Sequence, residues 1–121
     1  MSTRQQGEQG ERIASNYLEN KGLKFLDSNW YCKVGEIDLI MQEGPVRVLV
    51  EVRRRAPTAY GSAEETVNLN KQKKLLKAAK AYQQRENYWG DLRFDVVTVV
   101  MDEGSDDTDA LINHIPDAFG E

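Results

Sequence analysis

Residue types that mark several classes of protein are scarce in this chain of 121 residues. The single cysteine, Cys32, excludes an internal disulfide and agrees with a reducing compartment. The single histidine, His114, argues against a zinc site built from histidines. No apolar run approaches the ~20 residues of a membrane-spanning helix, and the N-terminus is polar rather than secretory. We therefore expect a cytoplasmic protein that does not act at a membrane.

Charge is distributed unevenly along the chain, whose formal net charge is -4. Residues 101–121 form an acidic C-terminal segment with seven acids and no lysine or arginine, whereas residues 1–100 contain 16 bases and 13 acids, a balance of +3. A mildly basic body permits nucleic-acid binding without requiring it. The length and a hydrophobic content of 40% fit one globular domain over residues 1–121.

Two helices and four or five strands are predicted. Apolar residues at helical spacing predict helices from about residue 6 to 21 and from about residue 70 to 88. β-Branched and aromatic runs predict the strands 23–31, 35–42, 46–54 and 93–100, with a short edge strand at 111–115. This order predicts an α/β or α+β domain in which helices pack against a mixed sheet.

The ends of these elements give three further expectations. Pro116 should stop the edge strand, because proline donates no hydrogen bond to a sheet. Phe119 is a candidate to dock the C-terminus. Residues 54–67 are expected to form a long loop, and loops of that length often have a functional role.

Two of the strand-like runs carry acids where a buried strand ordinarily has none, Asp38 in the first and Glu51 in the second. The Gly-Pro turn between the runs predicts a hairpin, and pairing of Met41 with Val48 would place Asp38 opposite Glu51 on one face. Facing carboxylates repel each other unless a divalent cation lies between them. The pair therefore suggests a Mg²⁺ site, although a solvated hairpin face with cross-strand ion pairs is an equally good interpretation of these residues alone.

Short motifs between residue 7 and about residue 100 resemble the YraN-type family of uncharacterised bacterial proteins in their order and spacing. The matching motifs include Gly7-Glu8, Gly10-Glu11, Asn29-Trp30-Tyr31, Gly35-Glu36-Ile37-Asp38-Leu39-Ile40, Val50-Glu51-Val52-Arg53 and Arg93-Phe94-Asp95-Val96-Val97. That family in turn resembles the restriction-endonuclease-like superfamily, and Holliday-junction resolvases in particular. The resemblance implies a restriction-endonuclease-like fold and a metal-dependent endonuclease that acts on DNA, with branched DNA as a candidate substrate.

The resemblance also implies a set of site residues. Such nucleases carry an acid on an N-terminal helix, an aspartate on one strand and a Glu-x-Lys motif on the next, which here correspond to Glu11, Asp38 and Glu51. These three acids would bind Mg²⁺, with Mn²⁺ as a substitute. Arg53 occupies the lysine position, where it can grip a phosphate but cannot act as a base. A resolvase cuts two strands, so a homodimer is expected under that interpretation only.

Basic residues near these acids are candidates to contact nucleic acid. They are Arg53, Arg54, Arg55, Lys71, Lys73 and Lys77. Lys71 lies near the edge of the apolar stripe of the second helix and is expected to point toward the site. A solvated helix face is a somewhat better interpretation of the lysines that cluster at Lys73, Lys77 and Lys80 than phosphate contact is.

Two other functions remain open. The first is a non-catalytic nucleic-acid-binding or accessory module that keeps the nuclease fold. Arg53 favours that alternative, and the retention of all three acids opposes it. The second is a protein-interaction module that uses the acidic C-terminal segment, which only the segregation of charge supports.

Overall fold

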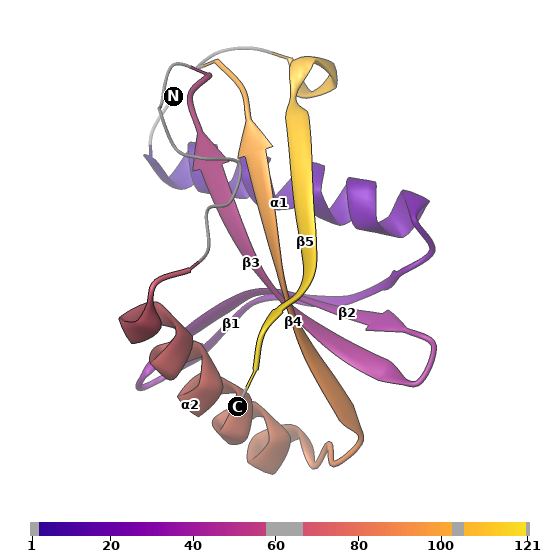
Figure 1. The fold of residues 1–121 in the computed structure, drawn as a ribbon, viewed down its shortest axis with the longest axis vertical. Helices are drawn as coiled ribbons and strands as arrows, with labels where there is room; N and C mark the ends of the chain where they lie inside the picture. Colours follow the sequence, from indigo (N-terminus) through magenta and orange to yellow (C-terminus); the bar gives the residue numbers. More distant parts are fainter. Residues whose placement is uncertain (1–2, 58–66, 103–105, 121) are drawn as a thin grey trace.

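The structure is a computed structural model that describes residues 3–57, 67–102 and 106–120. Its elements are α1 (Thr3–Asn20), β1 (Lys24–Cys32), β2 (Gly35–Glu43), β3 (Val46–Arg55), α2 (Leu69–Glu86), β4 (Asp91–Val100), the 3-10 helix η1 (Asp107–Asp109) and β5 (Leu111–Phe119) (Figure 1). The strands form one five-stranded sheet in the order β1-β2-β3-β4-β5. β3 and β4 are parallel, and the other three neighbouring pairs are antiparallel.

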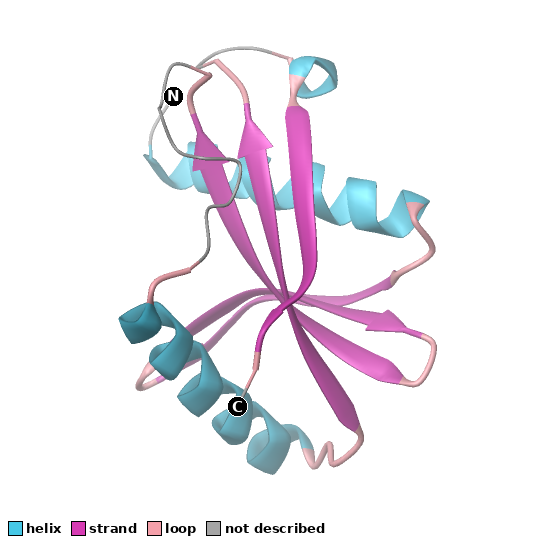
Figure 2. Ribbon diagram, viewed as in Figure 1, coloured by secondary structure: helices cyan, strands magenta, loops and turns pink. Residues whose placement is uncertain are grey.

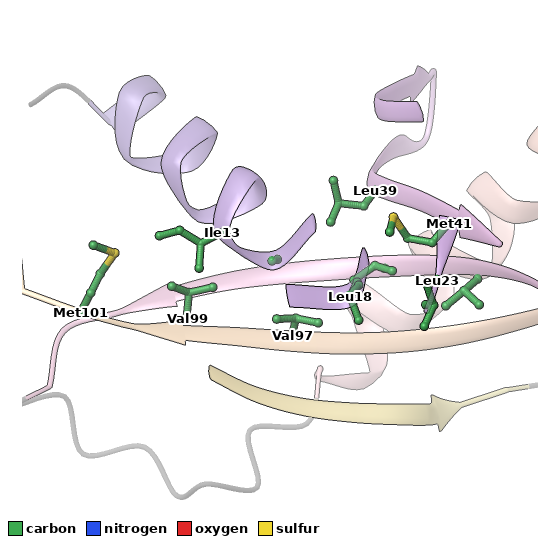
Figure 3. Close-up of a cluster of buried hydrophobic side chains, with 11 residues drawn as sticks. Ile13, Leu18, Leu23, Leu39, Met41, Val97, Val99 and Met101 are labelled. Atoms are coloured by element: carbon green, nitrogen blue, oxygen red, sulfur yellow. The ribbon is translucent and has the colours of Figure 1, made fainter. Parts of the chain in front are cut away.

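The sheet lies between two helices (Figure 2). α2 forms the crossover that a parallel connection from β3 to β4 requires. Alternate residues of β3 face opposite helices: Val48 and Val50 join a hydrophobic cluster with α1, whereas Leu49 joins a cluster with α2. Figure 3 shows the first cluster, in which Ile13 and Leu18 of α1 lie over the sheet. The predicted α/β class with a mixed sheet is confirmed.

Asparagine caps mark both ends of α2, one through its side chain and the other through its backbone. The Asn68 side chain accepts a hydrogen bond from the backbone N–H of Lys71 at 2.9 Å, which satisfies one of the free donors of the first turn. Asn87 ends the helix in the left-handed conformation, with φ of 52°. The N-terminal cap also places Lys71 in the first turn, next to the end of β3.

The last strand differs from the prediction. β5 does not stop at Pro116 but continues to Phe119, which stacks on Phe94 with ring centroids 4.8 Å apart, as expected of a docked C-terminus. The register with β4 shifts between Phe94 and Val96, and the Asp117 backbone N–H donates to the side chain of Asp95 in β4 instead of to the backbone of that strand. Pro116 is tolerated because β5 is an edge strand with this irregularity.

The other predicted elements agree with the structure to within a few residues. Most of the predicted loop, residues 58–66, lies outside the described residues. Within the described ranges, no helix is long and apolar enough to cross a membrane.

Candidate functional site

The candidate site lies where β2 and β3 separate. Met41 pairs with Val48 as predicted, and the ladder continues to Leu39 and Val50. One residue further along β2, the ladder ends and a side chain takes over as the acceptor. The Oδ2 of Asp38 accepts a hydrogen bond of 2.8 Å from the Val52 backbone N–H, in the place of a backbone carbonyl of β2. β2 then follows β1 while β3 continues beside β4, and the two strands diverge (Figure 1).

Asp38 and Glu51 form a buried carboxylate pair at this point. Each residue is only 8% exposed, and their side chains are hydrogen-bonded to each other. Burial, and then the hydrogen bond and negative charge of Glu51, raise the pKa of Asp38 to about 9, although the bond from Val52 acts in the opposite direction. The two carboxyl groups therefore share a proton at neutral pH when no metal ion is bound.

Basic side chains lie around the pair in an open pocket of about 450 Å³, which we call the carboxylate pocket. Its lining consists of Asp38, Glu51, Val52, Arg53, Arg54, Arg55, Val67, Asn68 and Lys71. The ammonium of Lys71 lies 3.4 Å from Glu51 Oε2, so this lysine points toward the site as predicted.

The three arginines of the pocket differ in their surroundings. Arg53 and Arg55 are half-buried and lie on the same face of β3 as Glu51. The aliphatic part of Arg54 packs instead along α1 beside Gly10. Its Nε and Nη2 atoms are buried and have no hydrogen-bond partner among the described residues. Arg53 and Arg55 are therefore better placed than Arg54 to contact a phosphate in the pocket.

Glu11 does not join the pair. It is half-buried on α1, where Oε1 accepts a hydrogen bond of 2.9 Å from Asn29, and it lines a separate pocket of about 290 Å³. Burial raises the pKa of Glu11, although the bond from Asn29 opposes this effect. Among the described residues, no group of three or more acids, histidines or cysteines is arranged to hold a metal, so the expectation that Glu11 converges with Asp38 and Glu51 is wrong for this structure.

The position of α1 explains this outcome. The helix packs on one face of the sheet, whereas the carboxylate pair lies on the face covered by α2. Glu11 reaches Asp38 only through its charge, which contributes a small increase to the pKa of Asp38. Two predicted basic residues also lie outside the pocket: Lys73 and Lys77 are exposed on α2.

Sequence analysis missed a second buried acid, Asp95, which is fully buried. Its carboxylate accepts bonds from Arg93 at 2.8 and 3.0 Å, contacts His114 Nε2 at 2.7 Å and accepts a bond from the Asp117 N–H at 3.0 Å. Burial acts to raise the pKa of Asp95, but the bonds from His114 and Arg93 outweigh burial and lower it. The signal in the sequence was an aspartate within a β-branched run, and its role is to hold β5 against β4.

Comparison with known proteins places the chain in a family. A family model described as "Uncharacterised protein family UPF0102" matches residues 10–99. The chain belongs to this family. A UPF0102 protein of Vibrio campbellii is 46% identical over 123 residues, which cover 99% of this chain and 96% of the relative. A UPF0102 protein of Pseudomonas syringae pv. tomato is 42% identical over 122 residues, which cover 98% and 95% of the two chains. The resemblance to YraN-type proteins is thereby confirmed, since these proteins constitute the UPF0102 family, and the matched range includes Glu11 and the whole carboxylate pocket.

Proposed function

We propose that this protein is a Mg²⁺-dependent, endonuclease-like protein that acts on DNA, with the carboxylate pocket as its reaction site. The observation that carries the proposal is the buried, hydrogen-bonded Asp38–Glu51 pair in an open pocket beside Arg53 and Lys71. Burying two carboxylates side by side destabilises a fold. A buried pair that is costly to the fold and lines an open pocket is characteristic of a functional site.

The donor set of the pocket fits Mg²⁺. This ion commonly keeps several waters and takes one or two protein carboxylates together with substrate phosphates. Asp38 and Glu51 would supply those two carboxylates, and Mn²⁺ would bind to the same oxygens. Glu11 lies outside this ligand set, and its proposed contribution is the negative charge that it adds near Asp38. A bound ion would supply Lewis acidity and a water of lowered pKa.

The basic residues of the pocket suit the handling of a phosphodiester. In hydrolysis, water forms a bond to phosphorus, the bond from phosphorus to the leaving oxygen breaks, and a proton passes from the water to the leaving group. The guanidinium of Arg53 would hold the nonbridging oxygens in a bidentate manner and stays protonated throughout. Lys71, beside Glu51, would add a compact positive charge at the edge of the pocket.

One observation favours the non-catalytic alternative. The ion pair between Lys71 and Glu51, at 3.4 Å, already compensates part of the carboxylate charge without a metal. Together with Arg53 at the usual lysine position, this pair is what a nucleic-acid-binding module that has lost catalysis would show. Such a module would bind DNA and would cleave neither linear nor branched substrates.

Cleavage of linear and branched DNA in Mg²⁺ and in Mn²⁺ distinguishes the two functions. Wild type should cleave DNA, and Asp38→Asn should abolish the activity. Asp109→Asn, which alters an exposed acid on η1, is the matched control and should cleave like wild type. No cleavage by any of the three proteins in either metal would favour the accessory module. Equal cleavage by Asp38→Asn and wild type would place the reaction elsewhere.

Action on branched DNA adds a requirement for assembly. Two strands must be cut, so a resolvase needs two copies of the carboxylate pocket in one complex. Under this proposal the chain forms a homodimer on a four-way junction, which sedimentation of the protein with and without the junction would detect. A monomer on the junction would restrict the proposal to an endonuclease that cuts a single strand.

A further inference from the structure

A second cavity, of about 490 Å³, lies between α2 and the turn that joins β1 to β2. We call it the turn cavity. Among the described residues, four basic side chains and no acid line it: Lys33 from the turn, and Lys77, Lys80 and Arg85 from α2. Lys33 and Lys77 are exposed and form no ion pair with the described residues. The charges of Lys33 and Lys77 are therefore not neutralised by the described residues.

The walls of the turn cavity are held in place before any ligand binds. Arg85 Nη1 donates a hydrogen bond of 3.1 Å to the backbone carbonyl of Tyr31, and its guanidinium lies 4.7 Å from the centre of the Trp30 ring. The Cys32 thiol donates to the Gly35 carbonyl at 3.4 Å and so closes the turn on itself. These contacts fix the turn against α2, so binding requires little ordering of the backbone.

Between the cations the floor of the turn cavity is apolar, because Val34 and Ala81 line it together with the aliphatic stems of the lysines. Val34 is 42% exposed and so offers an apolar surface that a ligand can contact. A ligand that matches both features has separated negative charges and a flat apolar face. A strand of nucleic acid with an unstacked base has both, whereas a duplex hides the faces of its bases inside the stack.

The acidic C-terminal segment is not the natural occupant of the turn cavity. Asp107 of that segment is bonded to Arg12 at 2.9 Å and to Gln9 at 3.1 Å, both on α1. Asp107 is thus engaged on the opposite face of the sheet, against α1. The charges of Lys33 and Lys77 therefore remain available to a partner.

We propose that the turn cavity binds a single-stranded segment of nucleic acid, with phosphates on Lys33, Lys77 and Lys80 and a base against Val34 and Ala81. Nucleic acid as the ligand rests on the proposed function. Lys71 of the carboxylate pocket and Lys80 are nine residues apart on α2, or about 14 Å along the helix. They lie about two and a half turns apart, so a strand that contacts both must also pass around the helix and needs more than the about four nucleotides that the axial distance alone would require. The proposal therefore predicts substrates with a single-stranded arm beside the reacting phosphate.

Cys32 provides the test, because it lines the turn cavity and is the chain's single cysteine. The rate at which an aromatic disulfide reagent labels Cys32 is measured without divalent metal, in the presence of three polyanions of matched charge. These are oligodeoxythymidine of about 12 nucleotides, within the range of known single-strand site sizes, a duplex of the same length, and polyglutamate. The single strand should slow labelling severalfold, and the other two should slow it far less. Equal protection by the duplex or by polyglutamate would overturn the proposal.

Replacing lysines of the turn cavity tests whether protection of Cys32 depends on their charge. Lys33→Gln combined with Lys77→Gln should remove most of the protection by the single strand. The slope of the logarithm of the binding constant, measured by protection, against the logarithm of the salt concentration should also become smaller in magnitude by about 1.4. That is about 0.7 for each phosphate that a lysine no longer neutralises. Lys24→Gln combined with Lys74→Gln removes the same charge from exposed positions outside both cavities and should leave protection intact. Unchanged protection in the Lys33 and Lys77 variant would overturn the proposal.

The outcome is separable from that of the proposed function. Asp38→Asn should lose DNA cleavage and keep full protection of Cys32, because Asp38 does not line the turn cavity. Protection of Cys32 without cleavage by any of the proteins would support binding at the turn cavity and contradict the proposed nuclease activity. Cleavage that depends on Asp38, without protection of Cys32, would support the nuclease activity and contradict binding at the turn cavity.

Discussion

At the scale of single residues, the Asp38–Glu51 pair is the feature that most needs an explanation. Asp38 also serves the fold, because its carboxylate accepts the Val52 N–H that would otherwise be left free where the strands diverge. An asparagine would supply the same acceptor, since its side-chain oxygen occupies the same place. The structural role therefore does not require a second charge beside Glu51, whereas binding of a cation does.

This reasoning predicts that Asp38→Asn stabilises the metal-free protein. The pKa of Asp38 is raised from 3.8 to about 9, so the folded state holds the proton more tightly than the unfolded state. Its contribution to stability is complete below the unfolded value and is lost as pH rises toward the folded value. Asparagine imitates the protonated form, so the variant should gain on the order of 1–3 kcal/mol in free energy of unfolding at about pH 8, and less at about pH 6.

Urea unfolding in a chelating buffer at both pH values measures the effect. Asp109→Asn is the control for the loss of one exposed carboxylate and should change stability little. An Asp38→Asn variant that is less stable than wild type at both pH values would show that the ionised carboxylate supports the fold.

Arg53 is the second residue on which the account depends. Its guanidinium is planar and larger than an ammonium, so it should position a water near the carboxylate pair less well than lysine. Misplacement by about 1 Å can cost on the order of 100-fold in rate. We expect wild-type cleavage to be weak and Arg53→Lys to increase kcat, with stability nearly unchanged. Single-turnover cleavage of branched DNA measures the change, and a slower Arg53→Lys variant would contradict the prediction.

At the scale of elements, the edge strand β5 depends on one buried acid of β4. Asp95 is fully buried and binds Arg93, His114 and the Asp117 backbone together. Removing one partner of a buried charged network leaves the others uncompensated, at a cost of about 3–5 kcal/mol. Asp95→Ala should therefore destabilise the protein by about that amount and loosen β5, which hydrogen exchange of the β5 amides would show as lost protection. Unchanged exchange in β5 would contradict this role.

The elements also show what could be predicted from sequence. Local patterns were sufficient for both helices and for the β2–β3 hairpin, because apolar periodicity and a Gly-Pro turn act over short distances. The same register placed Asp38 opposite Glu51, and the helical phase of Lys71 directed it toward the pair. These predictions required only neighbours on one strand, one hairpin or one helix.

Contacts between distant segments could not be predicted in this way. Glu11 was grouped with the pair by resemblance, but α1 covers the other face of the sheet and Asn29 holds its carboxylate there. β5 continues past Pro116 because the Asp95 carboxylate, 22 positions earlier in the chain, accepts a hydrogen bond from the Asp117 N–H. Both outcomes depend on how elements pack, which a single sequence leaves open.

At the scale of the whole molecule, binding to nucleic acid should be governed by phosphates. The basic residues of the carboxylate pocket and the turn cavity belong to a body whose 16 bases outweigh the 13 acids of residues 1–100. Affinity for DNA should therefore fall steeply as salt rises, with little preference for sequence. Fluorescence anisotropy with two unrelated sequences over a range of salt concentrations measures both properties. Affinity that stays constant as salt rises would contradict this mode of binding.

The most direct test of the central claim, that Asp38 and Glu51 bind a divalent cation, is calorimetric titration with Mn²⁺ in two buffers of different ionisation enthalpy. The pKa of Asp38 is raised to about 9, so an ion that binds to the pair near pH 7 must displace the shared proton. The account predicts Mn²⁺ binding with release of about one proton per ion, and loss of that binding in Asp38→Asn but not in Asp109→Asn. Mn²⁺ binding of equal strength in Asp38→Asn, or binding by wild type without proton release, would contradict it.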